Sequence, residues 1–136
     1  MPPALPRLIV TRPEPQAARF ARALRRRFAG RVRVILSPVM EIVTLPPPAG
    51  LENGPALILT SENAVRAAGT ALPAGATTHC VGARTAAAAR RAGLRVEIQA
   101  ETAEALIARL IRAPAAGPLL WLRGAHGRVP IADRLR

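Results

Sequence analysis

The chain has 136 residues, half of them apolar, and a formal net charge of +12. This length is typical of one domain, and the low aromatic content, 2%, predicts a core of aliphatic residues and alanine. No apolar run reaches the roughly 20 residues of a membrane span, and the proline-rich start lacks the apolar region of a signal peptide. The single cysteine, Cys80, excludes an internal disulfide and is compatible with the cytoplasm.

The positive charge comes from 20 arginines, with no lysine. Such a chain attracts polyanions at low salt, and arginine also binds carboxylates through paired hydrogen bonds. A nucleic-acid-associated domain is one interpretation, but the chain lacks stacking aromatics and a recognition-helix motif. We therefore expect no specific nucleic-acid partner and no membrane partner. A substrate with many carboxylates is the other interpretation of the charge.

The first part of the chain, residues 1–37, is predicted to form a β-α-β unit. Its elements are expected at residues 7–11 (strand), 15–28 (helix) and 32–36 (strand). Residues 38–55 include the run Pro46-Pro47-Pro48 and are predicted to be a crossover linker. A β-α-β unit this short would normally join a larger sheet.

Residues 56–136 are predicted to contain most of a second α/β domain. Strands are expected at 56–59, 77–81, 95–98 and 118–122, and helices at 62–71, 84–92, 103–112 and from about 127. Regular alternation of strands and helices implies parallel pairing with right-handed crossovers. The carboxyl ends of such strands lie at one edge of the sheet, where open α/β folds bind ligands.

Small and hydroxyl-bearing residues stand where two of these strands pass into helices. Thr60 and Ser61 follow the strand at 56–59, and their side-chain oxygens suit helix N-caps. Gly82 follows the strand at 77–81, where it allows a positive φ, a close backbone approach or simply a tight turn. Helix N-termini at these points present free N–H groups and a positive dipole end to anions.

Arg84 and Thr85 are expected to begin the helix that follows Gly82. A cation at a helix N-terminus is mildly unfavourable, and a nearby anion would offset this. A solvated surface arginine is the alternative for Arg84, and a helix cap or first-turn residue is the alternative for Thr85.

Two arginines are expected at the carboxyl ends of other strands. Arg12 ends the first strand, and either faces a ligand cleft or pairs with Glu14 or Glu41 at the surface. Arg123, followed by Gly124, ends the last strand, where a role in a ligand cleft is again one interpretation. These positions are consistent with binding carboxylates but do not require it.

No residue pattern predicts a catalytic group. His79 and Cys80 lie inside a predicted strand, where burial or exposure at a sheet edge is expected rather than catalysis, and no metal-ligand spacing occurs. The chain has no nucleophile elbow, no phosphate-binding loop and no evident pair of carboxylates for acid–base catalysis. We therefore expect neither a metal nor a cofactor, and assign no catalytic residue.

Five short motifs resemble uroporphyrinogen-III synthases in their order and spacing. They are Ile9-Val10-Thr11-Arg12-Pro13, Ser37-Pro38-Val39-Met40-Glu41-Ile42, Thr60-Ser61-Glu62-Asn63-Ala64-Val65, Val81-Gly82-Ala83-Arg84-Thr85-Ala86 and Leu119-Leu120-Trp121-Leu122-Arg123-Gly124. The resemblance implies a two-domain α/β fold with flavodoxin-like parallel sheets flanked by helices. Together with the places of these residues at the carboxyl ends of the predicted strands, the resemblance implies substrate-binding roles for eight residues: Arg12, Thr60, Ser61, Gly82, Arg84, Thr85, Arg123 and Gly124.

The resemblance also implies a reaction. Members of that family are cofactor-free cytoplasmic lyases, typically monomeric, that act in haem, sirohaem and cobalamin biosynthesis. Their substrate is hydroxymethylbilane, a linear tetrapyrrole with eight carboxylates, which is cyclised with loss of water and inversion of ring D. The family's tyrosine near the cleft aligns after residue 136, and this chain contains no tyrosine.

Family members are nearly twice as long as this chain. By that alignment the chain is expected to be an amino-terminal piece with an incomplete fold, lacking the last strand of domain two and most of domain one. Such a piece is expected to self-associate through unpaired strand edges and to be inactive alone. The alternative function is a non-catalytic α/β module that binds a tetrapyrrole or another anion.

Overall fold

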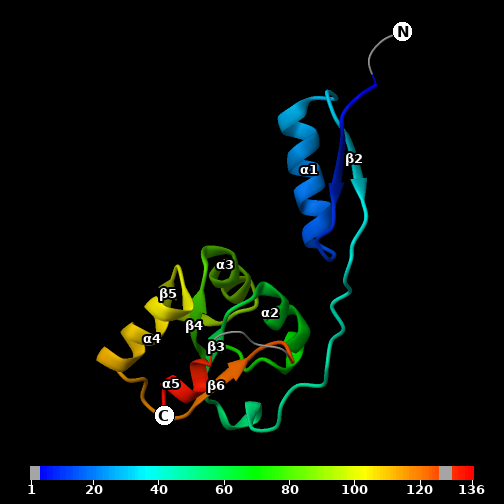
Figure 1. The fold of residues 1–136 in the computed structure, drawn as a ribbon. Coiled ribbons are helices and arrows are strands. Elements are labelled where there is room, and N and C mark those ends of the chain that lie inside the picture. Colours follow the sequence, from blue (N-terminus) through cyan, green and yellow to red (C-terminus); the bar gives the residue numbers. More distant parts are fainter. Residues whose placement is uncertain (1–3, 126–129) are drawn as a thin grey trace. The chain divides into compact units, whose positions relative to one another are not determined.

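The computed structural model describes residues 4–125 and 130–136 and divides the chain into two compact units, residues 1–44 and 45–136. Each unit has a parallel β-sheet of its own (Figure 1). The parallel sheets flanked by helices that the sequence predicts are therefore confirmed. The domain boundaries expected from the sequence stay a prediction.

The smaller unit is a β-α-β element. It consists of β1 (Arg7–Val10), α1 (Gln16–Phe28) and β2 (Arg33–Leu36). The two strands pair in parallel, and α1 packs on them with Ala17 and Ala21 fully buried. Successive strand residues alternate between faces, so Val10 is buried while Ile9 is 65% exposed. One face of this two-stranded sheet is therefore open.

The larger unit contains a four-stranded parallel sheet with the order β5-β4-β3-β6. Its strands are β3 (Ala56–Leu59), β4 (Thr77–Val81), β5 (Arg95–Ala100) and β6 (Leu119–Leu122). Its helices are α2 (Glu62–Ala68), α3 (Ala83–Arg91), α4 (Ala103–Arg112) and α5 (Ile131–Arg134), with short 3-10 turns η1 (Leu51–Asn53) and η2 (Gly69–Ala71). Within the described residues, no helix combines the length and apolarity that crossing a membrane requires.

Alternation along β3 divides the core of the larger unit into two layers. Leu57 and Leu59 pack in one cluster with residues of α2 and α3. Ile58 packs in the other, with Leu106 and Ile107 of α4 and with a residue of α5. β3 is thus buried on both faces, which is typical of a central strand in a parallel sheet.

Most elements match their predicted ranges within one residue, and three differ by more. α2 ends at Ala68 rather than at 71, because Gly69 takes a positive φ of 49° and the chain continues as a 3-10 turn. β5 extends two residues beyond its predicted end, to Ala100. The last helix covers only Ile131–Arg134, and residues 127–129, where it was expected to begin, lie outside the described residues.

His79 lies in β4 between Ile58 of β3 and Ile98 of β5, as part of the buried sheet. It is 1% exposed, and neither ring nitrogen has a hydrogen-bond partner among the described residues. Burial lowers the pKa of His79 from its ordinary value of 6.5, and the Glu97 carboxylate opposes this shift only in part. The folded larger unit therefore holds His79 neutral at pH 7.

We predict that acid destabilises the larger unit through His79. In the unfolded chain this histidine takes up a proton at its ordinary pKa, whereas in the folded unit it does so only at a lower pH. The free energy of unfolding therefore falls as the pH drops below about 6.5, by up to about 1.4 kcal/mol per pH unit. Urea unfolding from about pH 7.5 to 5.5 should show this loss, and His79→Leu should remove most of it. An equal loss in both proteins would contradict the prediction.

Candidate functional site

The sheet of the larger unit has one point where its winding reverses. From β3 the chain passes through α2 to β4 and through α3 to β5, and α4 then returns it to β6 on the other side of β3. In open α/β sheets, ligands bind outside the carboxyl ends of the strands at such a switch point. Here those ends are Thr60-Ser61 after β3 and Arg123-Gly124 after β6.

The pairing register brings these two strand ends together. Leu59 of β3 is the direct partner of Leu122 of β6, so Thr60 and Arg123 are the next residues on neighbouring strands. On the other side, Leu59 pairs with Cys80, one residue before the end of β4. Three of the four strands therefore deliver predicted site residues to the same edge of the sheet.

Ser61 and Thr60 have different roles at the end of β3. Ser61 is the N-cap of α2, and its Oγ accepts a hydrogen bond from the Asn63 N–H at 3.1 Å. Thr60 precedes the cap and is half-buried, so the prediction that both residues cap the helix holds only for Ser61. The Ser61 hydroxyl keeps its own O–H as a donor, since an N-cap uses only a lone pair of the oxygen.

Gly82 joins β4 to α3 in a conformation that favours glycine. It is the N-cap of α3, with φ 84° and ψ 142°, and its N–H donates to the Ala100 carbonyl of β5 at 2.8 Å. That N–H is therefore committed to the protein. The prediction of a positive φ is correct. A Cβ atom at this position would have no other atom within 4 Å, so the backbone conformation, and not a lack of space, favours glycine here.

The first turn of α3 has backbone N–H groups available to a ligand, unlike Gly82, whose N–H is already bonded to the Ala100 carbonyl. The helix has no side-chain cap, and its first intrahelical bond runs from the Ala86 N–H to the Gly82 carbonyl. The N–H groups of Ala83, Arg84 and Thr85 precede that bond and point out of the helix end, as an anion site requires. Arg84 is exposed, whereas the Thr85 side chain is 5% exposed, so Thr85 contributes to this edge mainly through its backbone.

Arg123 is held in place by contacts within its own strand end. Its Nη1 donates to the Gly124 and Ala125 carbonyls, both at 3.3 Å. Its Cζ lies 5.1 Å from the centroid of the Trp121 ring, which is within cation–π range. The side chain is exposed, so this guanidinium is both oriented and accessible at the switch point.

Arg12 belongs to the smaller unit, which is described by itself. Its Cζ lies 5.9 Å from the centroid of the Phe20 ring, and the residue is exposed. Glu14, one of the two partners considered for Arg12, accepts a hydrogen bond from the Ala18 N–H at 3.2 Å and so supports the start of α1. A substrate-binding role for Arg12 stays a prediction.

Two features of this edge were missed from the sequence. The end of β5 carries Glu101 and Thr102, and Thr102 caps α4 by accepting from the Ala105 N–H at 3.1 Å. The capping pattern of Thr102 was visible, but the strand before it was predicted to end too early. For Trp121 the sequence predicts only a place in a strand, because a cation–π partner two residues away gives no periodic signal.

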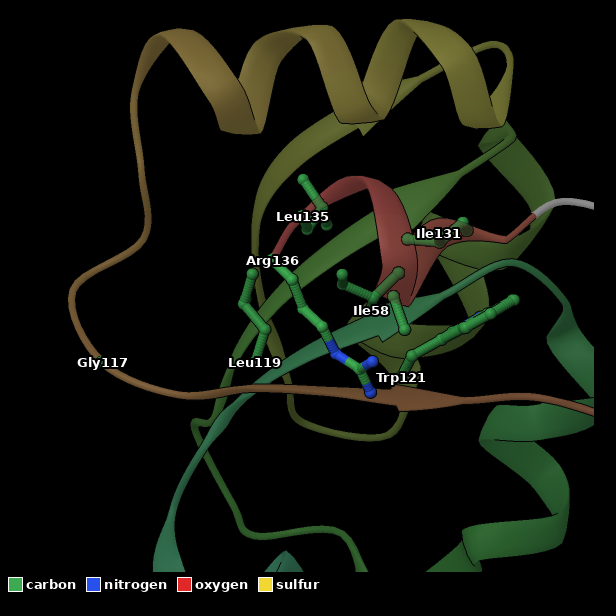
Figure 2. A pocket seen from close by; sticks show the side chains of 8 residues that line it. Ile58, Gly117, Leu119, Trp121, Ile131, Leu135 and Arg136 are labelled. Atoms are coloured by element: carbon green, nitrogen blue, oxygen red, sulfur yellow. The ribbon is translucent and has the colours of Figure 1, made fainter.

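The structure also has a hollow of about 340 Å³, which Trp121 borders as it borders Arg123. It is lined by apolar side chains of β3, β6 and α5, among them Ile58, Trp121 and Ile131, by Gly117 before the start of β6, and by the charged Arg136 (Figure 2). None of the predicted site residues lines it. The hollow therefore does not mark the predicted site.

Metal binding and thiol chemistry find no support in the described part of the chain. Residues 4–125 and 130–136 contain no group of three or more His, Cys, Asp or Glu side chains placed to hold a metal ion. Burial raises the pKa of the Cys80 thiol to about 11, although Arg90 opposes the shift. A protonated, buried thiol is a poor nucleophile, so Cys80 is a core residue.

We predict that Gly82→Ala destabilises the larger unit nearly as much as Gly82→Val. The cost comes from the φ of 84°, which is strained for any residue with a Cβ, and should be about 1–3 kcal/mol. Gly124→Ala is the matched control, because Gly124 has no such φ and an equally open surrounding. Chemical unfolding of the three variants measures the loss. A harmless Gly82→Ala, or a loss at Gly124→Ala of equal size, would contradict this account.

Comparison with known proteins identifies the family of the chain. The family model for the uroporphyrinogen-III synthase HemD matches residues 18–136, which include both the switch point and the α3 N-terminus. No curated protein matches the chain. Because the match covers most of the sequence, the chain belongs to the uroporphyrinogen-III synthase HemD family.

Proposed function

We propose that this chain forms a carboxylate-binding region of a uroporphyrinogen-III synthase. The observation that carries the proposal is the convergence at one sheet edge of Thr60, Ser61 and Arg123 with the uncapped N-terminus of α3. Every group in that set is a hydrogen-bond donor or a cation. A linear tetrapyrrole with many carboxylates, hydroxymethylbilane, is the substrate class that such a set suits.

The proposed reaction depends on positioning. The C–O bond of the terminal hydroxymethyl group breaks, the hydroxyl leaves with a proton as water, and a new C–C bond closes the macrocycle after ring D inverts. Fixing the carboxylates brings the two ends of the chain together and lowers the entropic part of the barrier. Donors already oriented by Ser61, α3 and Trp121 reorganise little on binding, which favours the same outcome.

We assign no proton donor for the departing hydroxyl. Apart from Glu62 in the first turn of α2 and Glu101 after β5, the described groups at this edge are hydroxyls, amides and arginines, which bind a carboxylate better than they transfer protons. That composition favours a second candidate, a non-catalytic module that binds tetrapyrroles or other anions. The two candidates make the same binding prediction and differ only in whether a type III product forms.

Location and partners follow from the same proposal. A small-molecule substrate, no specific nucleic acid and no membrane are the expected partners, with the cytoplasm as the compartment. The open face of the β1–β2 pair, with Ile9 exposed, supports the expectation that residues 1–136 self-associate when isolated.

Isomer analysis tests the catalytic proposal. The longest open reading frame that contains these 136 residues should convert hydroxymethylbilane to uroporphyrinogen III, whereas residues 1–136 alone should leave mainly the uncatalysed type I isomer. Thr60→Ala or Ser61→Ala should lower the rate only modestly, because the carboxylates are held by many groups. Chromatography of the oxidised products separates the two isomers.

The control for these variants is Thr70→Ala, which removes an exposed hydroxyl in η2, outside the proposed site. It should leave the rate unchanged. If the longest reading frame also yields only type I product, the enzymatic proposal is wrong and the binding module replaces it.

A further inference from the structure

We propose that Trp121 is a positioning residue that presents one edge of the Arg123 guanidinium to a substrate carboxylate. Arg123 stands at the switch point, and Trp121 precedes it by two residues on β6, on the same face of the strand. This role of Trp121 rests on the proposed function only in identifying the molecule that carries the carboxylate as a tetrapyrrole substrate. The binding step itself can be tested without the reaction.

The hydrogen bonds of Arg123 divide its donors into two sets. A guanidinium has five N–H groups, and the two on Nη1 are directed at the Gly124 and Ala125 carbonyls. Among the described residues, no partner is recorded for Nε or Nη2. These two atoms form the edge of the guanidinium that binds a carboxylate through two parallel hydrogen bonds.

Trp121 limits the freedom that an exposed arginine otherwise has. A flexible side chain loses rotamer entropy when it binds, and one that is already held loses less. The Trp121 ring lies 5.1 Å below the guanidinium, and the two bonds at 3.3 Å are long, so the ring contact is a substantial part of what holds Arg123. Trp121 is itself fixed, because it packs against the buried cluster that contains Ile58 and Ile131.

The neighbouring strand end completes a two-point site. Thr60 follows β3 at the position next to Arg123, so a carboxylate on the Nε and Nη2 edge lies close to a hydroxyl and to the first turn of α2. Lysine could not replace arginine here, since an ammonium group offers no planar edge and stacks less well on an indole. The site therefore selects planar carboxylates over spherical anions such as chloride.

Intrinsic fluorescence measures this binding directly, because Trp121 is the only tryptophan of the chain. The probe is butane-1,2,3,4-tetracarboxylate, which does not absorb where tryptophan is excited, added to residues 1–136 at constant ionic strength set with sodium chloride. We expect a saturable change in Trp121 emission. Arg123→Gln should abolish this change. Arg123→Lys should weaken binding by about tenfold, because an ammonium group keeps the charge but cannot form the two parallel hydrogen bonds of a guanidinium.

Arg112→Gln is the matched control, since it removes the same charge from an exposed arginine at the end of α4. It should bind the probe as the unchanged chain does. Equal losses in Arg112→Gln and Arg123→Gln would mean general charge attraction and would overturn the inference, as would the absence of any saturable change.

Calorimetry separates the role of Trp121 from that of Arg123. Trp121→Leu should weaken probe binding by about two- to fivefold, the size of a cation–π contact at an exposed site, and Trp121→Phe, which keeps an aromatic face, should restore most of it. Circular dichroism checks that both variants fold. Unchanged affinity in a folded Trp121→Leu chain would overturn the positioning role.

One measurement needs no substitution and remains decisive if Trp121→Leu does not fold. The Arg123 Nε–H proton lies near the face of an indole, so its NMR signal should be shifted upfield by the ring current and should move when the probe binds. A signal at the position of a free arginine would overturn the inference. If Arg123→Gln binds the probe normally while the isomer assay yields type III product, this inference is wrong and the proposed function stands.

Discussion

The whole site depends on the parallel pairing of β3 with its two neighbours. Because β6, β3 and β4 run in the same direction and in register, the residues that follow Leu59, Val81 and Leu122 emerge at one edge. An antiparallel β6 would move Arg123 to the opposite edge and separate it from Thr60. The burial of β3 on both faces makes this pairing hard to change, since a one-residue slip would turn Ile58 toward the wrong helix layer.

Each ligand-binding group at this edge is held in position by a hydrogen bond to another part of the protein. Ser61 satisfies the Asn63 N–H, Gly82 gives its N–H to β5, and Arg123 gives Nη1 to two carbonyls. Among residues 4–125 and 130–136, the first N–H groups of α3 and the Nε and Nη2 edge of Arg123 have no partner, and these are the groups that a carboxylate can use. The fold thus fixes the donors first and leaves their outward sides to the ligand, which is the arrangement that binding without large reorganisation requires.

The local features of this site could be predicted from the sequence. Ser61 before a helical pattern indicates a cap, Gly82 between a strand and a helix indicates a positive φ, and regular alternation indicates a parallel sheet. The position of β6 beside β3 could not be predicted in the same way. Strand order is decided by contacts between segments some 60 residues apart, and no local pattern reports it.

Side-chain geometry was the other part that the sequence did not supply. Thr60 and Ser61 are equally good caps by residue type, and only the path of the backbone gives the role to Ser61. The contact between Trp121 and Arg123 depends on the rotamers of two side chains. The place of His79 in a strand left burial and edge exposure both open. Its burial, and its lack of any hydrogen-bond partner among the described residues, are evident only from the packed core.

NMR mapping of the isotopically labelled chain tests the central claim most directly. Uroporphyrin III, a stable tetrapyrrole octacarboxylate, would be added to residues 1–136 while backbone amide shifts are followed. The account predicts that the largest changes fall on residues that follow β3, β4 and β6, with Arg84, Thr85 and Arg123 among them. Changes confined to the hollow lined by Leu119 and Ile131, or spread over all arginine-bearing helices, would contradict it.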